Sequence, residues 1–299
     1  MLIASPLDGT RLFALEAGQG EPALVFIHGN GADHTAWHHQ IAFFSRRRRV
    51  VAVDLRGHGR SGRDPHERYV QDTFVADVLA VLHEMGGGPS VLVGWSMAGS
   101  IASRIAVEHP ELVAGVVFVD HNVQGVKAEL GLESGPWSSA AILRGLEDDF
   151  EGHGFRRMVD SWFPETGQRI DALKQWLWEI GMQAGRATVL GIRQVGVKED
   201  RRHWLREMRT PALVLQGADS YIGGRAVGEY LHGLVRGSEL HAFDGHGHAV
   251  FLTAPAEFNR ARRVAGPSAA RQVVSERLRV TGRRGRRPLS DPVGRPVPG

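Results

Sequence analysis

The feature that most constrains the fold of this chain is a repeated alternation between short apolar runs and segments long enough to form a helix. The apolar runs occur at residues 23–29, 49–57, 90–95, 115–120, 211–217 and 239–243. Continuous apolar runs of this length are typical of strands buried on both faces of a sheet, and strands separated by helices form parallel βαβ units. The chain is therefore predicted to adopt an α/β fold with a mostly parallel central sheet flanked by helices.

Helices are predicted between these runs from the spacing of apolar residues and from the residues that end each segment. Phe74, Val78 and Leu82 recur at helical spacing, and three glycines followed by Pro89 end that helix. Further helices are expected at 36–45, 97–108, 224–234 and from Pro255 onward, and an Asp8-Gly9 hairpin turn begins the chain.

The alternation stops after Asp120. Residues 121–205 show helical patches, no convincing strand and five of the seven tryptophans. Such a segment is too long for a simple connection, so we interpret it as a helical cap inserted into the core. The predicted domains are a first part of the α/β core at 1–120, the cap at 121–205, a second part of the core at 206–265 and a basic, disordered tail at 266–299.

The positive charge of the chain is concentrated at its C-terminal end. Residues 260–299 contain eleven arginines against Glu276 and Asp291, a balance of +9. Because the whole chain carries +3, the remaining residues carry −6. Arginine-rich tails can bind nucleic acid or anionic lipid, but a solvated extension is the simpler interpretation, and no nucleic-acid partner is expected.

The composition is that of a soluble globular protein, with 42% hydrophobic and 23% charged residues. No uninterrupted apolar stretch reaches the roughly 18 residues of a membrane span, and the N-terminus lacks the pattern of a signal peptide. A cytoplasmic protein is therefore expected, and its oligomeric state is left open. The absence of cysteine excludes disulfides, thiolate nucleophiles and Cys-bound zinc.

A single hydroxyl stands out in the segment VLVGWSMAGSIA at 91–102. Ser96 lies where a predicted strand ends and a predicted helix begins, and ligands of open parallel sheets bind at the carboxyl ends of the strands. A sharp turn at this point exposes the serine and needs small neighbours, which Gly94, Ala98 and Gly99 supply. It also brings the backbone N–H of Met97 toward whatever bonds to Ser96, which suits a nucleophilic serine with an oxyanion donor beside it.

Three motifs of the chain resemble those of the α/β-hydrolases, and they occur in the same order along the sequence as in that family. The segment VGWSMAG is similar to their nucleophile elbow, G-x-S-x-G, with alanine in the last position. HGNGAD at 28–33 resembles their His-Gly oxyanion loop, and DLRGHGRS at 54–61 resembles the next family signature. The resemblance covers about 1–120 and 206–262, and it implies a serine-nucleophile member similar to esterases and perhydrolases.

The resemblance also implies roles for the histidine-containing loops. The second oxyanion donor would be the backbone N–H of Asn30, beside that of Met97. His28 and His58 would support their loops, with neither acting as the base.

The base is expected after the last strand, in FDGHGHAVFLTAPAEF. The family places a Gly-His pair about seven residues before a proline that opens the last helix. Counting back from Pro255 gives His248 as the base, with His246 as its neighbour. An imidazole suits this role because its ordinary pKa is near 6.5, so that it accepts and returns protons near neutral pH.

Two aspartates compete for the acid that orients the imidazole. The family usually carries this residue three positions beyond the glycine of ALVLQG, which here is Ser220. A loop shorter by one residue would bring Asp219 into that position, and Asp219 is the preferred candidate. The alternative is Asp120, which ends the strand at 115–120 and occupies a place that some family members use for their acid.

These residues predict a serine hydrolase that cleaves a small, partly apolar ester through an acyl-enzyme on Ser96. The alternatives are a cofactor-free perhydrolase or acyltransferase, a hydrolase of carbon–carbon bonds on the same triad, and a non-catalytic ligand-binding protein on a hydrolase scaffold. His34 and His38 have the spacing of zinc ligands on a helix, but no carboxylate motif accompanies them. A small-molecule substrate is therefore expected, with no metal and no cofactor.

Overall fold

The computed structural model describes residues 1–121, 123, 125–164, 170–196 and 200–261. The tail predicted at 266–299 lies outside the described residues.

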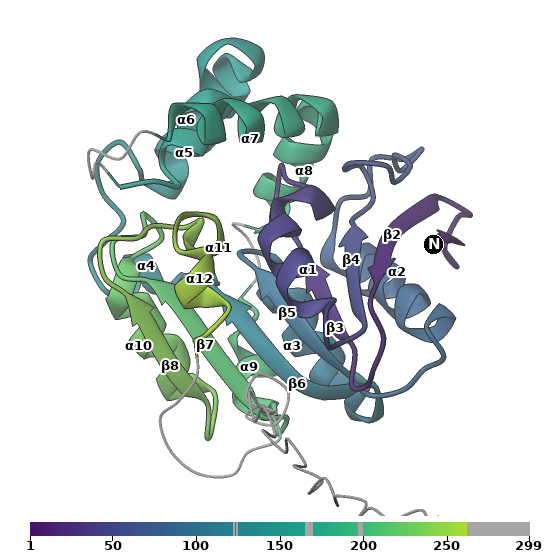
Figure 1. Ribbon diagram of the computed structural model, residues 1–299. Helices are drawn as coiled ribbons and strands as arrows, with labels where there is room; N and C mark the ends of the chain where they lie inside the picture. The colour runs from purple at the N-terminus through teal and green to yellow at the C-terminus, as the bar shows by residue number, and fades with distance from the viewer. Residues whose placement is uncertain (122, 124, 165–169, 197–199, 262–299) are drawn as a thin grey trace, which may run out of the picture.

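An eight-stranded sheet forms the centre of the structure, in the order β1-β2-β4-β3-β5-β6-β7-β8 (Figure 1). β2 pairs antiparallel with β1 and β4, and the other neighbours pair in parallel, so the prediction of a mostly parallel sheet is confirmed. The strands are β1 (Leu2–Ala4), β2 (Arg11–Ala17), β3 (Leu24–Ile27), β4 (Val50–Asp54), β5 (Ser90–Trp95), β6 (Val113–Val119), β7 (Ala212–Gly217) and β8 (Glu239–Phe243).

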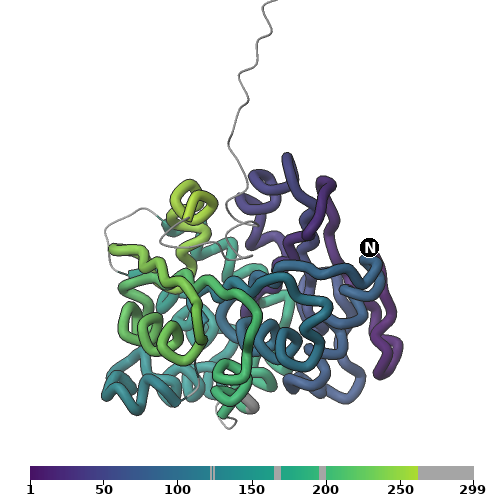
Figure 2. Tube along the Cα trace, turned by 90° about the horizontal axis from the view of Figure 1, so that it is seen from below, coloured from purple at the N-terminus to yellow at the C-terminus, as the bar shows by residue number. Residues whose placement is uncertain are grey.

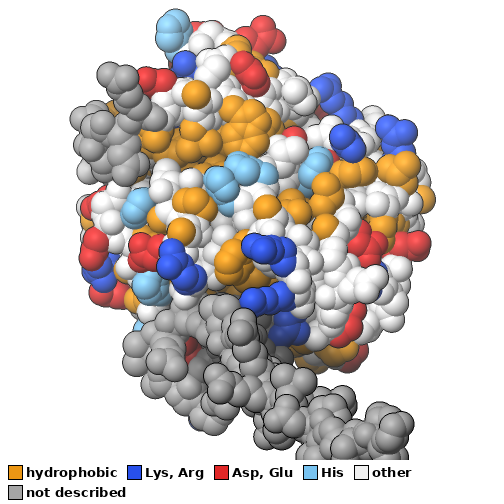
Figure 3. Space-filling view, in the orientation of Figure 1, with side chains coloured by type: hydrophobic (Ala, Val, Ile, Leu, Met, Phe, Trp, Pro, Cys, Tyr) orange, Lys and Arg blue, Asp and Glu red, His pale blue; other side chains and the backbone are white. Residues whose placement is uncertain are grey.

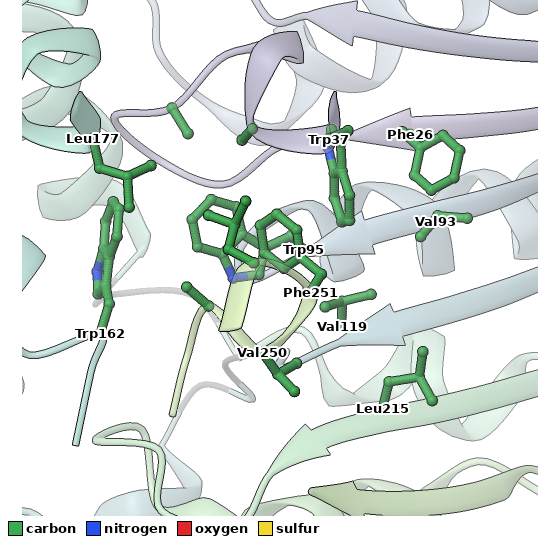
Figure 4. Close-up of a cluster of buried hydrophobic side chains, with 14 of the residues drawn as sticks. Phe26, Trp37, Val93, Trp95, Val119, Trp162, Leu177, Leu215, Val250 and Phe251 are labelled. Atoms are coloured by element: carbon green, nitrogen blue, oxygen red, sulfur yellow. The ribbon is translucent and has the colours of Figure 1, made fainter. Parts of the chain in front are cut away.

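Helices cover both faces of the sheet, and alternate strand residues therefore divide between two cores. In β3, Val25 and Ile27 pack with the helices of one face, whereas Phe26 packs with Trp37 and Phe251 on the other (Figure 4). Every residue of β3, β4, β5 and β7 is buried, as expected for central strands. The first face carries α2 (Gln71–Glu84), α3 (Ala98–Glu108) and α10 (Gly224–Leu234), and the second carries η1 (His34–Trp37), α1 (His38–Phe44), α11 (Val250–Thr253) and α12 (Pro255–Phe258).

Between β6 and β7 the described chain is helical. Figure 1 shows α5 to α8 as a layer above the sheet, whereas α9 packs against α3 on the body. The predicted insertion at 121–205 thus contains both the layer over the sheet, which we call the cap, and segments that belong to the body. The described helices between β6 and β7, in cap and body together, are α4 (Val126–Glu129), α5 (Ser139–Asp148), the π-helical turn η3 (Phe150–Gly154), α6 (Phe155–Asp160), α7 (Asp171–Ala184), α8 (Arg186–Gly196) and α9 (Arg202–Glu207).

The cap packs against the body through Phe155, which is fully buried. A Cβ atom added to Gly31, in the loop after β3, would lie 2.6 Å from the Phe155 ring, and one added to Gly181 of α7 would overlap the same ring. Phe155 therefore fills the space between the loop after β3 and the cap helix α7. Glycine at both positions lets the two backbones approach the ring closely.

The outer surface reflects this layered arrangement. Viewed from below, the N-terminal part of the chain and the part from α10 onward lie on opposite sides of the molecule (Figure 2). Hydrophobic and histidine side chains gather where the cap meets the body (Figure 3), a region in which His38 of α1 contacts Trp176 of α7. Among the described residues, no helix is both long enough and apolar enough to cross a bilayer.

Candidate active site

Ser96 occupies a strained turn between β5 and α3. Its φ angle is +56°, in the left-handed region that non-glycine residues rarely adopt. The backbone holds it there, because its N–H donates to the Val119 carbonyl at 2.9 Å and its carbonyl accepts from the Gly99 N–H at 3.1 Å. A residue kept in such a conformation costs about 1–3 kcal/mol and is a mark of functional sites.

The small residues around Ser96 differ in how strictly they are needed. A Cβ atom on Gly94 would lie 2.6 Å from the Ala98 carbonyl oxygen, and one on Gly99 would lie 2.5 Å from the His121 ring. Ala98, by contrast, carries its own Cβ and is fully buried in the core as the first residue of α3. The departure from the G-x-S-x-G pattern therefore falls at the position of this turn that accommodates a methyl group.

We expect Gly94→Ala to lower the free energy of unfolding by about 3 kcal/mol, because its methyl group would meet backbone that cannot move aside. Ala98→Gly is the matched change at the other end of the motif and is expected to cost less than about 1 kcal/mol. Urea unfolding of both variants measures the difference. Equal costs would show that the turn is not limited by space at Gly94.

His248 and Asp120 form a buried pair. The Nδ1 atom of His248 lies 2.5 Å from the Oδ2 atom of Asp120, and both side chains are almost fully excluded from solvent. Asp120 follows β6 in a left-handed conformation, with φ +43°. Its carboxylate also accepts hydrogen bonds from the Gly217 N–H at 2.8 Å and from the Ser220 hydroxyl at 2.6 Å. These donors fix the orientation of the Asp120 carboxylate toward the imidazole.

The imidazole is thus bonded to Asp120, the alternative candidate, and the preferred candidate Asp219 lies elsewhere. The Asp219 carboxylate accepts instead from the Gly245 N–H at 2.8 Å. The position that the resemblance assigned to the acid is filled by Ser220, whose hydroxyl donates to Asp120. The carboxylate thus comes from the end of β6, and the neighbouring β7 end supplies a hydroxyl and a backbone N–H that hold it.

His246 does not contact the Ser96 turn. Its Nδ1 atom lies 2.9 Å from the Thr253 hydroxyl, and its carbonyl accepts from the Asp219 N–H at 3.0 Å. These contacts join the loop that carries His248 to α11 and to the end of β7.

The loop after β3 approaches Ser96 closely. A Cβ atom on Gly29 would lie 3.1 Å from the Cβ atom of Ser96, so the backbone of this loop borders the serine directly. Asn30 follows, and its side-chain amide donates to the Val189 carbonyl of α8 at 2.9 Å. On the other side, Met97 immediately precedes α3, so its backbone N–H lies at the N-terminus of that helix. Backbone donors at a helix N-terminus are suited to a developing negative charge.

His28 and His58 are buried, and backbone groups occupy both ring nitrogens of each. His28 bonds to the Gly29 carbonyl at 2.7 Å and accepts from the Leu55 N–H at 3.0 Å. His58 bonds to the Arg56 carbonyl at 3.1 Å and accepts from the Gly31 N–H at 3.2 Å. Burial lowers the pKa of both rings, that of His58 to about 3. Both histidines therefore hold their loops as neutral rings.

A pocket lies between the cap and the carboxyl end of β5. Sequence reasoning identified Ser96, His248 and Asn30, which line it, but not Tyr221 and Arg193. Tyr221 packs edge-on against the imidazole of His248, with ring centres 5.1 Å apart. The Trp95 indole donates to the His248 carbonyl at 2.9 Å and so fixes the backbone of that residue. The remaining lining residues are Gly29, Met158 and Trp162.

His121 supports the Ser96 turn through a hydrogen bond. It is 2% exposed, and its Nδ1 atom lies 2.7 Å from the Ser96 carbonyl oxygen, to which it donates. The ring stacks on Phe118, with centres 5.5 Å apart. Burial lowers the pKa of His121 to about 4, and the bond to the Ser96 carbonyl offsets this only in part.

This lowered pKa predicts a loss of stability in mild acid. The unfolded chain binds a proton at His121 near its ordinary pKa of 6.5, whereas the folded protein resists protonation down to about 4. Stability is thus present above 6.5 and is lost as the pH falls toward 4. Between pH 7 and pH 5 the wild type should lose about 2 kcal/mol more unfolding free energy than His121→Gln. Urea unfolding at both pH values measures this, and equal losses would contradict it.

One cluster outside the pocket has the composition of a metal site. Ligand atoms of Asp33, His34 and Asp54 lie within 4.8 Å of one another. Asp54, however, already accepts from the His34 backbone at 2.7 Å, from the His34 ring at 2.8 Å and from the Arg60 N–H at 2.8 Å. Asp33 accepts from the Thr35 N–H at 2.8 Å and caps η1. The cluster is therefore explained by the hydrogen bonds that hold this loop.

The sequence matches the model of the alpha/beta hydrolase family over residues 24–261. It is 29% identical to (E)-2-((N-methylformamido)methylene)succinate hydrolase of Acinetobacter baylyi, covering 82% of this chain and 90% of that protein. It is 28% identical to 2-hydroxy-6-oxononadienedioate/2-hydroxy-6-oxononatrienedioate hydrolase of Burkholderia vietnamiensis, covering 85% and 90%. The structure resembles an esterase from Exiguobacterium antarcticum with a TM-score of 0.76, 22% identity and coverage of 86% and 96%. The chain belongs to the alpha/beta hydrolase family.

Proposed function

We propose that this protein is a serine hydrolase that cleaves a small, partly apolar ester through an acyl-enzyme on Ser96. One observation carries the proposal. Ser96, held in a strained turn, shares a pocket with His248, and the far side of that imidazole is bonded to Asp120. A nucleophile, a base and a residue that orients the base are the parts that acyl transfer requires.

The hydrogen bond to Asp120 defines which ring nitrogen is the base. Because the carboxylate accepts at Nδ1, that atom carries the proton and Nε2 has a free lone pair. In the proposed first step Nε2 removes the Ser96 hydroxyl proton as the oxygen attacks the acyl carbon. The tetrahedral oxyanion is held by the N–H groups of Met97 and Asn30, and the imidazolium then gives its proton to the leaving alcohol.

Water completes the cycle. His248 removes a proton from water, hydroxide adds to the acyl carbon, and collapse of the second tetrahedral intermediate returns the proton to Ser96 and releases the acid. Asp120 keeps the imidazole oriented throughout, because the Gly217 N–H and the Ser220 hydroxyl hold its carboxylate in place.

The pocket supports a small substrate with an apolar portion. Trp95, Trp162 and Met158 are among the residues that line it. The fold likeness to an esterase is consistent with ester cleavage. Hydrolysis of a carbon–carbon bond on the same residues is the second candidate, because the relative from Burkholderia vietnamiensis is named for hydrolysis of a 2-hydroxy-6-oxo dienedioate or trienedioate.

A fluorophosphonate probe tests the proposal directly, since it reacts with activated serine nucleophiles whatever the acyl substrate. We expect one covalent adduct on Ser96 by mass spectrometry, together with turnover of short-chain p-nitrophenyl esters. Labelling of a different serine would refute the assignment of the nucleophile. A labelled protein that turns over no ester would favour the carbon–carbon substrate instead.

A further inference from the structure

The cap helix α8 brings a positive charge into the pocket. Its Val189 carbonyl accepts from the Asn30 side chain at 2.9 Å, so this face of the helix lies over the oxyanion loop. Arg193 follows Val189 by four positions, which places it on the same face one turn later. Arg193 lines the pocket together with Ser96, His248 and Tyr221.

The guanidinium of Arg193 has no carboxylate partner among the described residues. Its neighbour is the hydroxyl of Tyr221: burial raises the pKa of Tyr221, and the charge and hydrogen bond of Arg193 oppose that rise. The fully buried Arg56, by contrast, is paired with the Asp77 carboxylate at 2.6 Å. Arg193 is partly buried, and a ligand that displaces its remaining water favours the charge only if it carries a negative group itself.

The other charged groups near Tyr221 are already neutralised. Lys127 lies over the Tyr221 ring at 5.8 Å, but its ammonium is 3.7 Å from the Glu133 carboxylate. Asp120 lies behind the imidazole and is bonded to His248, Ser220 and the Gly217 N–H. Arg193 is therefore the charge that a bound substrate meets in this part of the pocket.

We infer that the substrate carries a carboxylate at some distance from its scissile bond, and that Arg193, assisted by the Tyr221 hydroxyl, binds it. This inference rests on the proposed function, since it names the class of ester that the Ser96 site accepts: the monoester of a short dicarboxylic acid. A planar guanidinium matches a carboxylate with two parallel N–H···O bonds. Hydrolysis then adds one water and yields the dicarboxylate and an alcohol.

The test compares substrates that differ only in charge. Monomethyl succinate, glutarate and adipate are each paired with the methyl ester of the corresponding monoamide, which has the same shape and is neutral. For at least one chain length the wild type should favour the acid about 10- to 100-fold in kcat/KM, the range expected for a hydrogen bond to a charged group. In Arg193→Gln that ratio of acid to amide should fall to near one, mainly through KM.

Arg186→Gln is the matched control. Arg186 lies on the same helix but is exposed and donates to the Glu147 carbonyl at 3.0 Å, outside the pocket. Its substitution should leave the acid-to-amide ratio unchanged. The inference is overturned if the wild type prefers the acid at no chain length, or if Arg193→Gln keeps the preference.

Failure of the proposed function would look different, since neither member of any pair would be hydrolysed and the fluorophosphonate would not label Ser96. In that case, calorimetric binding of glutarate and of its monoamide to Ser96→Ala still tests the inference. Tighter binding of glutarate that is lost in Ser96→Ala/Arg193→Gln supports it. Equal binding of the two compounds, or no binding of either, overturns it.

Discussion

Ser96→Ala is expected to lower kcat for p-nitrophenyl ester hydrolysis by about 10⁶-fold, to the level left by binding and by the oxyanion donors alone. In the proposed mechanism the hydroxyl oxygen of Ser96 forms the acyl bond, and alanine in the strained turn between β5 and α3 offers no nucleophile. Steady-state kinetics on purified protein measures the loss. The concentration of active sites is taken from fluorophosphonate titration of the wild type.

The alanine variant should also be slightly more stable or unchanged, because the substitution removes a polar atom and leaves the backbone of the turn as it is. Thermal unfolding provides this control and shows that any loss of activity does not come from misfolding. If Ser96→Ala retained more than about one hundredth of the wild-type kcat, a covalent intermediate on this residue would be excluded.

Asp120→Asn is expected to lower kcat by about 10⁴-fold, the effect of replacing a triad carboxylate with its amide. The amide no longer accepts the Nδ1–H of His248 as a carboxylate does, so the ring loses the tautomer that leaves Nε2 free. It also loses the negative charge that stabilises the imidazolium. Kinetics across pH 5–9 measures the effect, since an altered base changes the pH profile as well as the rate.

Asp219→Asn is the matched control one strand away. Its carboxylate bonds to the Gly245 N–H and does not contact the imidazole, so kcat should stay within a few-fold of the wild type. A large loss in Asp219→Asn with little change in Asp120→Asn would contradict the pairing of His248 with Asp120.

Much of the core could be predicted from the sequence because its signals are local. Apolar runs bounded by glycine defined the strands, and the helix at 224–234 and the strand at 239–243 were predicted with the bounds that the structure has. The choice of His248 likewise used only a local signal, the number of residues between it and the proline that opens the last helix. The helix α12 does begin at Pro255.

The acid could not be chosen in this way because it depends on the register between two strands. β6 and β7 align in parallel with Val119 beside Leu215, which brings Asp120 next to the Gly217 N–H. Three residues after Gly217, the chain supplies the Ser220 hydroxyl to the same carboxylate. Counting along one strand cannot show which carboxylate of two neighbouring strand ends faces the imidazole.

The cap residues that line the pocket could also not be predicted from the sequence. Trp162 and Arg193 lie far from Ser96 along the chain, and they line the same pocket because the segment after α6 and the helix α8 lie over the sheet. Trp162 has two roles, since it is buried in the hydrophobic core and also lines the pocket.

The cap is attached to the loop after β3, so that entry of a substrate under the cap would affect the loop that borders Ser96. Phe155 fills the space beside Gly31, and the Val189 carbonyl holds the Asn30 side chain. Lifting the cap to admit a substrate would therefore release the same loop whose backbone would bind the oxyanion. Closure of the cap over a substrate would likewise return this loop to its place beside Ser96, so that binding and assembly of the site would be coupled.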